Sequence, residues 1–456
     1  MIRTTLALAL ALLAAPAAAQ DTDARDAAER DIFKRAVEIP TVAGRGAMPA
    51  MTAMLSAELN KAGVSDIAIK QHDDTETLIA RWRADSPDAE PILLMAHMDV
   101  VEARREDWQH DPFTFREEDG FYFGRGVVDN KAGMVAIVAA LQRLNAAGFE
   151  PKRDIVVLFT GDEETTQNGA RLASTEWREL TEAEYALNSD AGGGGRFPDG
   201  KIDYFGIQVA EKVYADFKLA TANRGGHSSA PRDDNAIYQL AQALKNLEEY
   251  RFTPRLNEAT RPSWEHSAKT DGGIFGALVQ AWLEEPGNME YADAVESVSP
   301  GSTRTRCIAT MISGGHAPNA LPQAASANVN CRIFPTETVA EVEATLERIA
   351  GPEVAVELVP GGMPSPPSPL RADVVDAYTQ SVHTRFPDAP VLPEMSNGAT
   401  DGLFFRAAGT PVYGASALWG FVNEPLGVHG LDERVRAESF HDNIDHWERL
   451  LRNLAG

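Results

Sequence analysis

Two short apolar runs with a helical segment between them constrain the fold of this chain most strongly. Pro91 to Met95 and Ile155 to Phe159 each have the length of one buried strand, and residues 131–147 have the composition of a helix. A strand, a helix and a second strand in this order form a crossover unit with parallel strands. In sheets of this kind, sites form at the carboxyl ends of the strands. The sequence therefore predicts an α/β domain with a site just beyond these two runs.

The pattern of predicted elements changes near Glu211. Residues 20–211 and 363–456 are expected to form a catalytic domain with a mainly parallel sheet, and residues 212–362 an inserted α+β domain. The insertion reads as βαββαβ, with strands at 213–221, 304–312, 324–334 and 354–359 and helices at 235–247 and 339–349. Residues 252–300 are additional to this pattern, with a helix near 274–283, and the sequence does not indicate their purpose.

The N-terminal residues 1–19 have the pattern of a signal peptide. Arg3 is the positive start, Leu6 to Leu13 the apolar centre, and Ala17 to Ala19 a small-residue cleavage site before Gln20. No later stretch is as apolar and long as a membrane span. We therefore expect a periplasmic or secreted protein that is not held in a membrane. The net charge of −25 argues against a nucleic-acid partner.

Cys307 and Cys331 lie at equal distances from a turn-rich centre near Asn319. Antiparallel pairing of the two flanking strands would bring the cysteines together, and an exported protein meets an oxidising compartment. A shifted register would leave two buried free thiols. The sequence leaves both alternatives open.

Side chains suited to metal binding follow the predicted strand ends and several glycine-containing turns. In chain order they are His97, Asp99, Asp129, Glu163, Glu164, Asp190 and His429. Histidine nitrogen and carboxylate oxygen are zinc ligands, and two ions can share one carboxylate. Taken singly, a histidine at a strand end, an aspartate in a turn or a pair of glutamates is more often structural or simply solvated. Their occurrence together favours a two-metal site with one carboxylate left to act as a base.

These motifs resemble those of the dinuclear zinc amidohydrolases and exopeptidases, a family that includes acetylornithine deacetylase, succinyl-diaminopimelate desuccinylase, carboxypeptidase G and aminoacylase. The branch that the chain resembles most comprises carboxypeptidase S and the N-acyl-amino-acid hydrolases. The matching segments are residues 96–101, 124–133, 161–164, 188–190 and 428–430. One departure is Asn130, at a position where several branches have methionine.

The resemblance implies a role for each of the seven side chains. Asp129 would bridge the two ions, with His97 and Asp190 completing one metal site and Glu164 and His429 the other. Glu163 would be the general base, which takes a proton from water and returns it to the leaving nitrogen. Asp99 would hold the His97 ring in its ligating tautomer.

The resemblance extends to the inserted domain, which it implies is a lid and dimerisation domain. His227 would stabilise the oxyanion, in many relatives from the partner subunit. Asn319 and Arg332 would grip a substrate carboxylate, although Arg332 taken alone reads as a surface cation on a strand. Gly398 and Thr400 would contact substrate near the metals, with an ordinary glycine turn as the alternative.

Together these features predict a homodimeric enzyme with two zinc ions, although cobalt or manganese would suit the same ligands. It would cleave a peptide or N-acyl amide bond beside a free carboxylate, as a carboxypeptidase or aminoacylase does. An aminopeptidase or dipeptidase on the same site is one alternative, and Arg332 argues against the former because it would repel an α-ammonium group. A non-catalytic peptide-binding relative is the other, and the presence of Glu163 argues against it.

Overall fold

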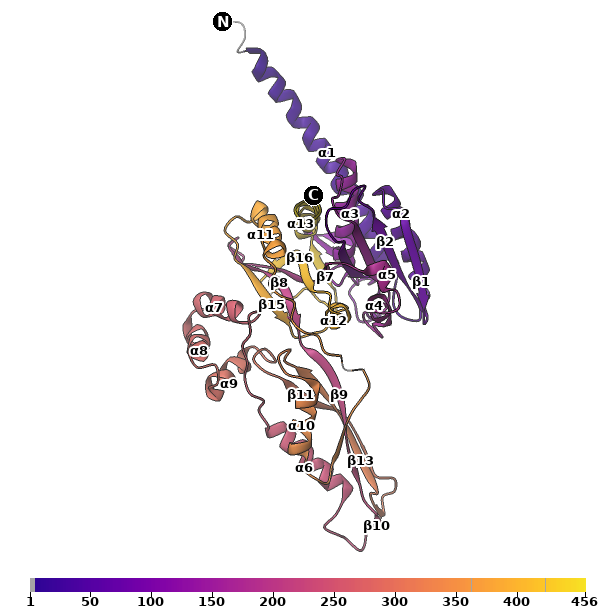
Figure 1. The fold of residues 1–456 in the computed structure, drawn as a ribbon, viewed down its shortest axis with the longest axis vertical. Coiled ribbons are helices and arrows are strands. Elements are labelled where there is room, and N and C mark those ends of the chain that lie inside the picture. The colour runs from indigo at the N-terminus through magenta and orange to yellow at the C-terminus, as the bar shows by residue number, and fades with distance from the viewer. Residues whose placement is uncertain (1–4, 362, 423) are drawn as a thin grey trace. The chain divides into compact units, whose positions relative to one another are not determined.

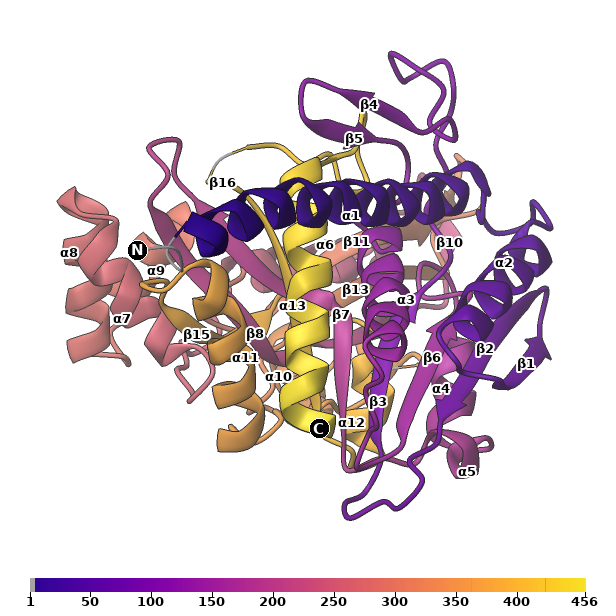
Figure 2. The ribbon, with the colours of Figure 1, turned by 90° about the horizontal axis from the view of Figure 1, so that it is seen from above.

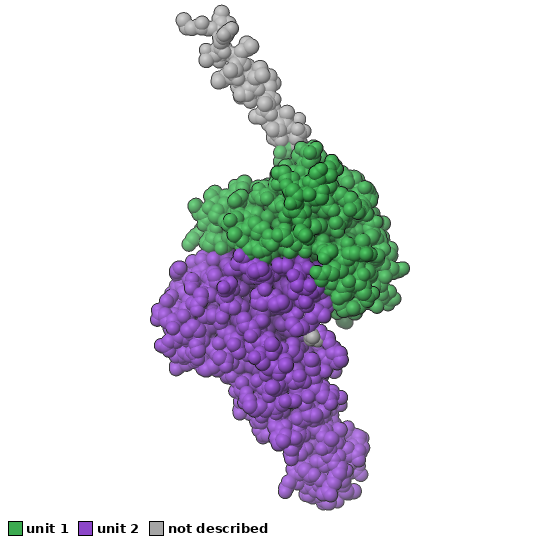
Figure 3. Space-filling model, viewed as in Figure 1, with its two compact units in different colours: residues 1–207, 371–391, 413–456 green, residues 208–370, 392–412 purple. Residues whose placement is uncertain are grey.

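The computed structural model describes residues 5–361, 363–422 and 424–456, with the backbone alone for residues 5–21. The expected signal peptide, residues 1–19, lies outside the residues whose side chains are described. The chain forms two compact units (Figure 3). Unit 1 comprises residues 1–207, 371–391 and 413–456, and unit 2 comprises residues 208–370 and 392–412. Among the described helices, none has both the length and the apolar character needed to cross a membrane.

The largest sheet has eight strands in the order β1-β2-β6-β3-β7-β16-β8-β15. Their bounds, in that order, are Asp66–His72, Thr75–Trp82, Ile155–Thr160, Ile92–His97, Tyr185–Arg196, Val412–Phe421, Ile202–Glu211 and Val391–Ser396. Figure 1 labels six of them, β1, β2, β7, β16, β8 and β15. The central strand β3 pairs in parallel with both β6 and β7, and β1 and β2 form an antiparallel edge. Every residue of β3 and β6 is buried, which explains why both read as continuous apolar runs. The prediction of an α/β fold with a large, mainly parallel sheet is confirmed.

Helices cover this sheet within unit 1. The long ones are α1 (Thr5–Glu38), α2 (Met48–Lys61), α3 (Lys131–Ala146), α11 (Ala372–Arg385) and α13 (Ala437–Ala455). Helix α3 packs on β3 and β7, and α1 and α13 pack on α3 in turn (Figure 2). Because α3 lies between the sheet and a second layer of helices, it is buried at most of its positions.

Several shorter elements of unit 1 were not predicted from the sequence. They are α4 (Asn168–Ser174), α5 (Arg178–Thr181) and the three-stranded sheet β17-β5-β4 (Arg434–Arg436, Phe121–Phe123, Arg116–Glu118). Elements of three to seven residues carry too few residues for a hydrophobic period to be recognised.

Unit 2 contains a four-stranded sheet in the order β11-β13-β9-β14, with α6 and α10 packed on it. The bounds are Arg306–Gly314, Ala324–Ile333, Val213–Ala222 and Ala355–Leu358 for the strands, and Ala236–Glu249 and Val339–Ala350 for the helices. In chain order these elements form the predicted βαββαβ arrangement. Unit 2 also contains the small ladder β10 (Gly226–His227) with β12 (Ala320–Leu321), and helix α12 (Gly402–Ala407).

The additional segment of unit 2 folds as three helices, α7 (Arg261–Thr270), α8 (Gly273–Glu284) and α9 (Met289–Val298). The predicted helix near 274–283 is α8. These helices enclose a small apolar core that includes Val279, Trp282 and Val295. Between β11 and β13, Cys307 lies opposite Cys331 in the register and the two form a disulfide. The structure therefore has the disulfide rather than the free thiols.

Candidate metal centre

The ends of β3 and β6 are joined through Asp99. In the parallel register His97 lies beside Thr160, so the turns that follow the two strands leave the sheet together. One carboxylate oxygen of Asp99 accepts a hydrogen bond from the backbone N–H of Glu163 (3.1 Å), and the other from that of Glu164 (3.0 Å). The His97 Nδ1 lies 3.0 Å from the Asp99 carbonyl oxygen and 3.5 Å from its carboxylate. Asp99 thus holds the two glutamates as well as the imidazole.

Asp129 lies between the two histidines. Its Oδ1 is 2.8 Å from His97 Nε2, and its Oδ2 is 3.2 Å from His429 Nε2. The His97 Nε2 is also 3.4 Å from Asp190 Oδ1, and the His429 Nε2 is 3.0 Å from Glu164. One carboxylate with an oxygen toward each imidazole is the arrangement expected of a bridging ligand.

Glu163 lies on the His97 side of this group. The ligand atoms of His97, Glu163 and Asp190 lie within 4.8 Å of one another, as do those of His97, Asp129 and Glu164. Gln167 donates a hydrogen bond from Nε2 to Glu163 Oε1 (2.8 Å). Unit 1 therefore brings together all seven side chains that the sequence singled out within it.

Asn130 has a role that the sequence did not reveal. Its Nδ2 donates to Asp190 Oδ1 (2.8 Å), and its Oδ1 accepts a hydrogen bond from the Ser189 hydroxyl (2.8 Å). The Asn130 side chain thus orients Asp190, although Asn130 itself belongs to the segment that carries Asp129. The position of Asn130 next to Asp129 was the one hint in the sequence of such a role. Its hydrogen-bond partner Asp190 lies 60 residues further along the chain, so the sequence could not identify it.

The titration behaviour of the group reflects burial and crowded charge. Burial opposes the charged form of His97, but the neighbouring carboxylates outweigh it and raise its pKa well above 6.5. The hydrogen bond to Asp129 raises the pKa of His429 to about 9. Burial and the charge of Asp129 raise the pKa of Glu164 to about 7, and burial raises the pKa of Asp190. Burial would also raise the pKa of Asp129, but hydrogen bonds from the two imidazoles lower it instead.

This donor set fits two divalent cations. The group contains five carboxylates and only two imidazoles. Buried carboxylates repel one another when they are ionised, and a cation bound between them removes this repulsion. His97 and Asp99 are almost fully buried, at 1% and 3% exposure, so water cannot screen them. Imidazole nitrogen with carboxylate oxygen is a donor set that zinc prefers, and one that cobalt or manganese also accepts.

The predicted lid residues His227 and Asn319 are neighbours within unit 2. His227 lies opposite Ala320 in the β10–β12 ladder, and the backbone N–H of Ser228 donates to the Asn319 carbonyl oxygen (3.0 Å). The exposed His227 ring accepts a hydrogen bond at Nδ1 from the backbone N–H of Ser229 (3.2 Å). In the neutral ring the proton is then on Nε2, so that nitrogen can donate to an oxyanion.

The other predicted substrate contacts are held by partners of their own in unit 2. The Arg332 guanidinium lies 4.8 Å above the Tyr214 ring. The backbone N–H and hydroxyl of Thr400 both donate to the buried carboxylate of Glu211 (2.9 and 3.2 Å), which also pairs with Arg406. Gly398 is exposed and its N–H donates to Ser396. Substrate contact by Thr400 remains a prediction, since its main donors face Glu211.

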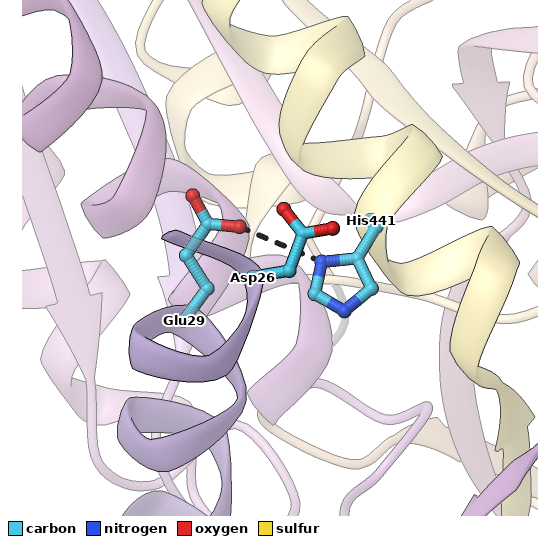
Figure 4. Close-up of side chains that lie close together, drawn as sticks. All are labelled: Asp26, Glu29 and His441. Atoms are coloured by element: carbon cyan, nitrogen blue, oxygen red, sulfur yellow. Dashed lines mark ion pairs between the residues drawn. The ribbon is translucent and has the colours of Figure 1, made fainter. Parts of the chain in front are cut away.

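A separate group of acids and a histidine belongs to helix packing instead. Figure 4 shows Asp26, Glu29 and His441, with the His441 ring 3.5 Å from Glu29. Arg143 binds both oxygens of Glu29 through Nε and Nη2 (2.6 and 2.9 Å). A guanidinium therefore already neutralises the carboxylate that a cation would need, and the group joins α1, α3 and α13.

The chain is similar to known proteins over most of its length. A family described as "Peptidase family M20/M25/M40" matches residues 93–453. The human N-fatty-acyl-amino acid synthase/hydrolase PM20D1 is 28% identical over 443 residues, covering 93% of this chain and 88% of its own. A probable carboxypeptidase S-like 2 of Dictyostelium discoideum is 26% identical over 394 residues, covering 83% of this chain and 74% of its own.

Solved structures show the same fold. A metallo-carboxypeptidase of Sulfolobus solfataricus superposes with a TM-score of 0.67 at 19% identity, covering 93% of this chain and 98% of its own. The YXEP protein of Bacillus subtilis, described as a dinuclear metal binding peptidase, gives a TM-score of 0.61 at 15% identity, covering 94% of this chain and 98% of its own.

Proposed function

Because this chain belongs to peptidase family M20/M25/M40, we propose that it hydrolyses an amide bond beside a free carboxylate, in N-acyl amino acids or peptides, with two zinc ions. The observation that carries the proposal is the placement of Asp129 between His97 and His429, with Glu163 beside them. Bound there, two metal ions would activate a water and polarise the scissile carbonyl.

The side chains divide the remaining work. Glu163, whose Oε1 accepts a hydrogen bond from Gln167, receives the water proton and delivers it to the leaving nitrogen. Asp99 keeps Glu163 and Glu164 at their positions through the two backbone hydrogen bonds. Arg332 and Asn319 are proposed to bind the substrate carboxylate, and His227 to donate from Nε2 to the oxyanion.

The test is hydrolysis by the zinc-loaded protein and its Glu163→Gln variant. The panel holds N-acyl amino acids, C-terminal dipeptides with blocked amines, free dipeptides and amino-acid anilides. We expect cleavage only where the carboxylate is free, and a loss of about 10²- to 10⁴-fold in kcat for Glu163→Gln. The exposed Glu176→Gln is the matched control and should retain full activity.

Other outcomes would redirect the proposal. Cleavage of anilides would indicate an aminopeptidase, and preference for free dipeptides a dipeptidase. Two bound metal ions with no turnover of any substrate would support the non-catalytic peptide-binding relative.

Export to the periplasm or the medium is part of the proposal. It is supported by the signal-like pattern of residues 1–19 and by the Cys307–Cys331 disulfide, since such bonds persist in oxidising compartments. Expression of the full chain in a Gram-negative host, followed by fractionation and N-terminal sequencing, tests this. A cytoplasmic protein that retains Met1 would contradict it.

Homodimerisation through unit 2 is also proposed. Strand β11 lies at the edge of its sheet, and it exposes Ile308, Met311 and Ile312 at 63%, 71% and 69%. An exposed apolar edge strand readily pairs with another strand, and a second copy of β11 would cover it symmetrically. Ile312→Lys should therefore give a monomer in sedimentation analysis, whereas Ile274→Lys on α8, which is 82% exposed, should not.

The same variant tests whether His227 acts across the dimer. If it does, the Ile312→Lys monomer should retain both metal ions and lose activity. Full activity in a proven monomer would show that His227 serves its own subunit.

A further inference from the structure

Glu433 joins the two loops that carry Asp129 and His429. Its side chain is completely buried, and it lies four residues beyond His429 in the chain. One carboxylate oxygen accepts hydrogen bonds from the backbone N–H groups of Val128 (2.8 Å) and Asp129 (3.1 Å). The other accepts from the N–H of Gly126 (2.9 Å) and from Arg125 Nη1 (2.6 Å). Four donors thus saturate the carboxylate.

Arg125 completes a second connection between the same loops. Its Nη2 donates to the Gly430 carbonyl oxygen (2.7 Å), and its guanidinium lies 5.1 Å from the Trp108 ring. The backbone adds a further bond, because the Gly124 N–H donates to the Glu433 carbonyl oxygen (3.1 Å). Arg125 is itself almost fully buried, so this ion pair is shielded from water.

The loop that carries His429 requires such an anchor. His429 and Asp432 have left-handed backbones, with φ of 54° and 49°, which is a costly conformation for residues with a side chain. Gly427 has φ of 76°, and a Cβ there would lie 2.7 Å from the Leu431 carbonyl oxygen and 2.9 Å from the Glu433 Cα. Strained backbone of this kind persists only where the surrounding contacts determine it.

From these contacts we propose that Glu433 is a positioning residue that sets the distance between Asp129 and His429 and so the affinity of the metal centre. The inference rests on the proposed two-metal site and assigns Glu433 no contact with metal or substrate. Replacing Glu433 would let the two loops move apart. The ion proposed to bind Glu164 and His429 would be affected most, because it needs both Asp129 and His429.

The experiment measures metal binding by the full chain with and without Glu433→Gln. Glutamine has nearly the same shape, but its NH₂ group would face donors and the charge opposite Arg125 would be lost. Zinc affinity is measured by competition with a chromophoric chelator, and cobalt is added as a visible-absorption probe of ligand geometry. We expect affinity for one of the two ions to fall by about 10- to 100-fold, as for other partners that orient ligands, with a changed cobalt spectrum.

Glu29→Gln is the matched control. Glu29 is also buried and also binds an arginine with both oxygens, since Arg143 donates to it at 2.6 and 2.9 Å. Because Glu29 lies on helix α1 and contacts neither the Asp129 loop nor the His429 loop, its replacement should lower thermal stability and leave zinc affinity and the cobalt spectrum unchanged.

Each result decides between the alternatives. Unchanged affinity and spectrum in Glu433→Gln would overturn the inference, even if the melting temperature fell. If that variant does not fold, Arg125→Met is measured in its place, and wild-type affinity in that folded variant would overturn the inference equally. If the wild-type protein itself binds no zinc or cobalt, the metal centre fails, which is distinct from failure of the Glu433 role.

Discussion

Replacement of Asp99 by asparagine should loosen the turn that carries Glu163 and Glu164. The Asp99 carboxylate accepts one backbone N–H from each glutamate, at 3.1 and 3.0 Å, and its residue is only 3% exposed. Asparagine has a single acceptor oxygen. Its NH₂ group would therefore face one of the two N–H groups, and burial of this position keeps bulk water from replacing the lost acceptor.

The magnitude follows from these contacts. One buried donor left unsatisfied costs about 1–3 kcal/mol, and the surviving bond loses the strength that a charged acceptor provides, about 1 kcal/mol more. The free energy of unfolding should therefore fall by about 2–4 kcal/mol. Because Glu163 and Glu164 move with the turn, kcat/KM should fall by about 10- to 100-fold.

Urea denaturation of the metal-free protein and hydrolysis of an N-acyl amino acid by the zinc-loaded protein measure the two effects. Asp111→Asn is the control, because Asp111 also accepts a backbone N–H (2.9 Å, from Phe113) but is exposed. It should change the free energy of unfolding by less than about 0.5 kcal/mol. If Asp99→Asn matched this control in both assays, the assignment of Asp99 as the anchor of the glutamate turn would be refuted.

Three further predictions concern stability. Arg143→Met leaves the Glu29 carboxylate buried without its guanidinium and should lower the free energy of unfolding by about 3 kcal/mol, whereas the Glu29→Gln, Arg143→Met double variant should lose less. Burial lowers the pKa of His446 to about 3, so between about pH 6.5 and 3 only the unfolded chain binds a proton at this residue. The free energy of unfolding should therefore decrease by about 1.4 kcal/mol for each pH unit as the pH is lowered from 6 to 4. Urea titrations of His446→Gln at the same pH values should lack this decrease. Replacing Cys307 and Cys331 by serine should cost about 3 kcal/mol, and dithiothreitol should destabilise the wild type alone.

The sequence could predict the candidate metal centre because several of its candidate ligands follow elements with a strong local signal. His97 ends one wholly apolar strand, and Glu163 and Glu164 follow another. Parallel strands in register align their carboxyl ends. His97 and Glu163, which are 66 residues apart in the chain, are therefore expected to be neighbours from the strand pattern alone. For these three side chains composition and spacing were sufficient, because burial of both strand faces requires apolar side chains throughout. The resemblance to a known family implied the roles of Asp129, Asp190 and His429.

The sequence could not predict which polar groups hold the candidate ligands or the predicted substrate contact Thr400. Glu433 reaches the Asp129 N–H across 304 residues, Asn130 reaches Asp190, and Glu211 holds Thr400. None of these carboxylates or amides belongs to a periodic pattern, and each reads locally as an ordinary polar residue.

What the sequence determined by itself is the alternation of strands and helices around β3 and β6 and the set of candidate ligands in their chain order, since hydrophobic periodicity and side-chain chemistry are local properties. Tertiary structure alone decided that Asp99 also holds the turn of Glu163 and Glu164, and that Asn130 and Glu433 hold the segments of Asp190 and Asp129. The reason is that a buried hydrogen-bond donor or acceptor takes its partner from whatever segment the fold brings within about 3 Å, and that choice leaves no trace in chain order.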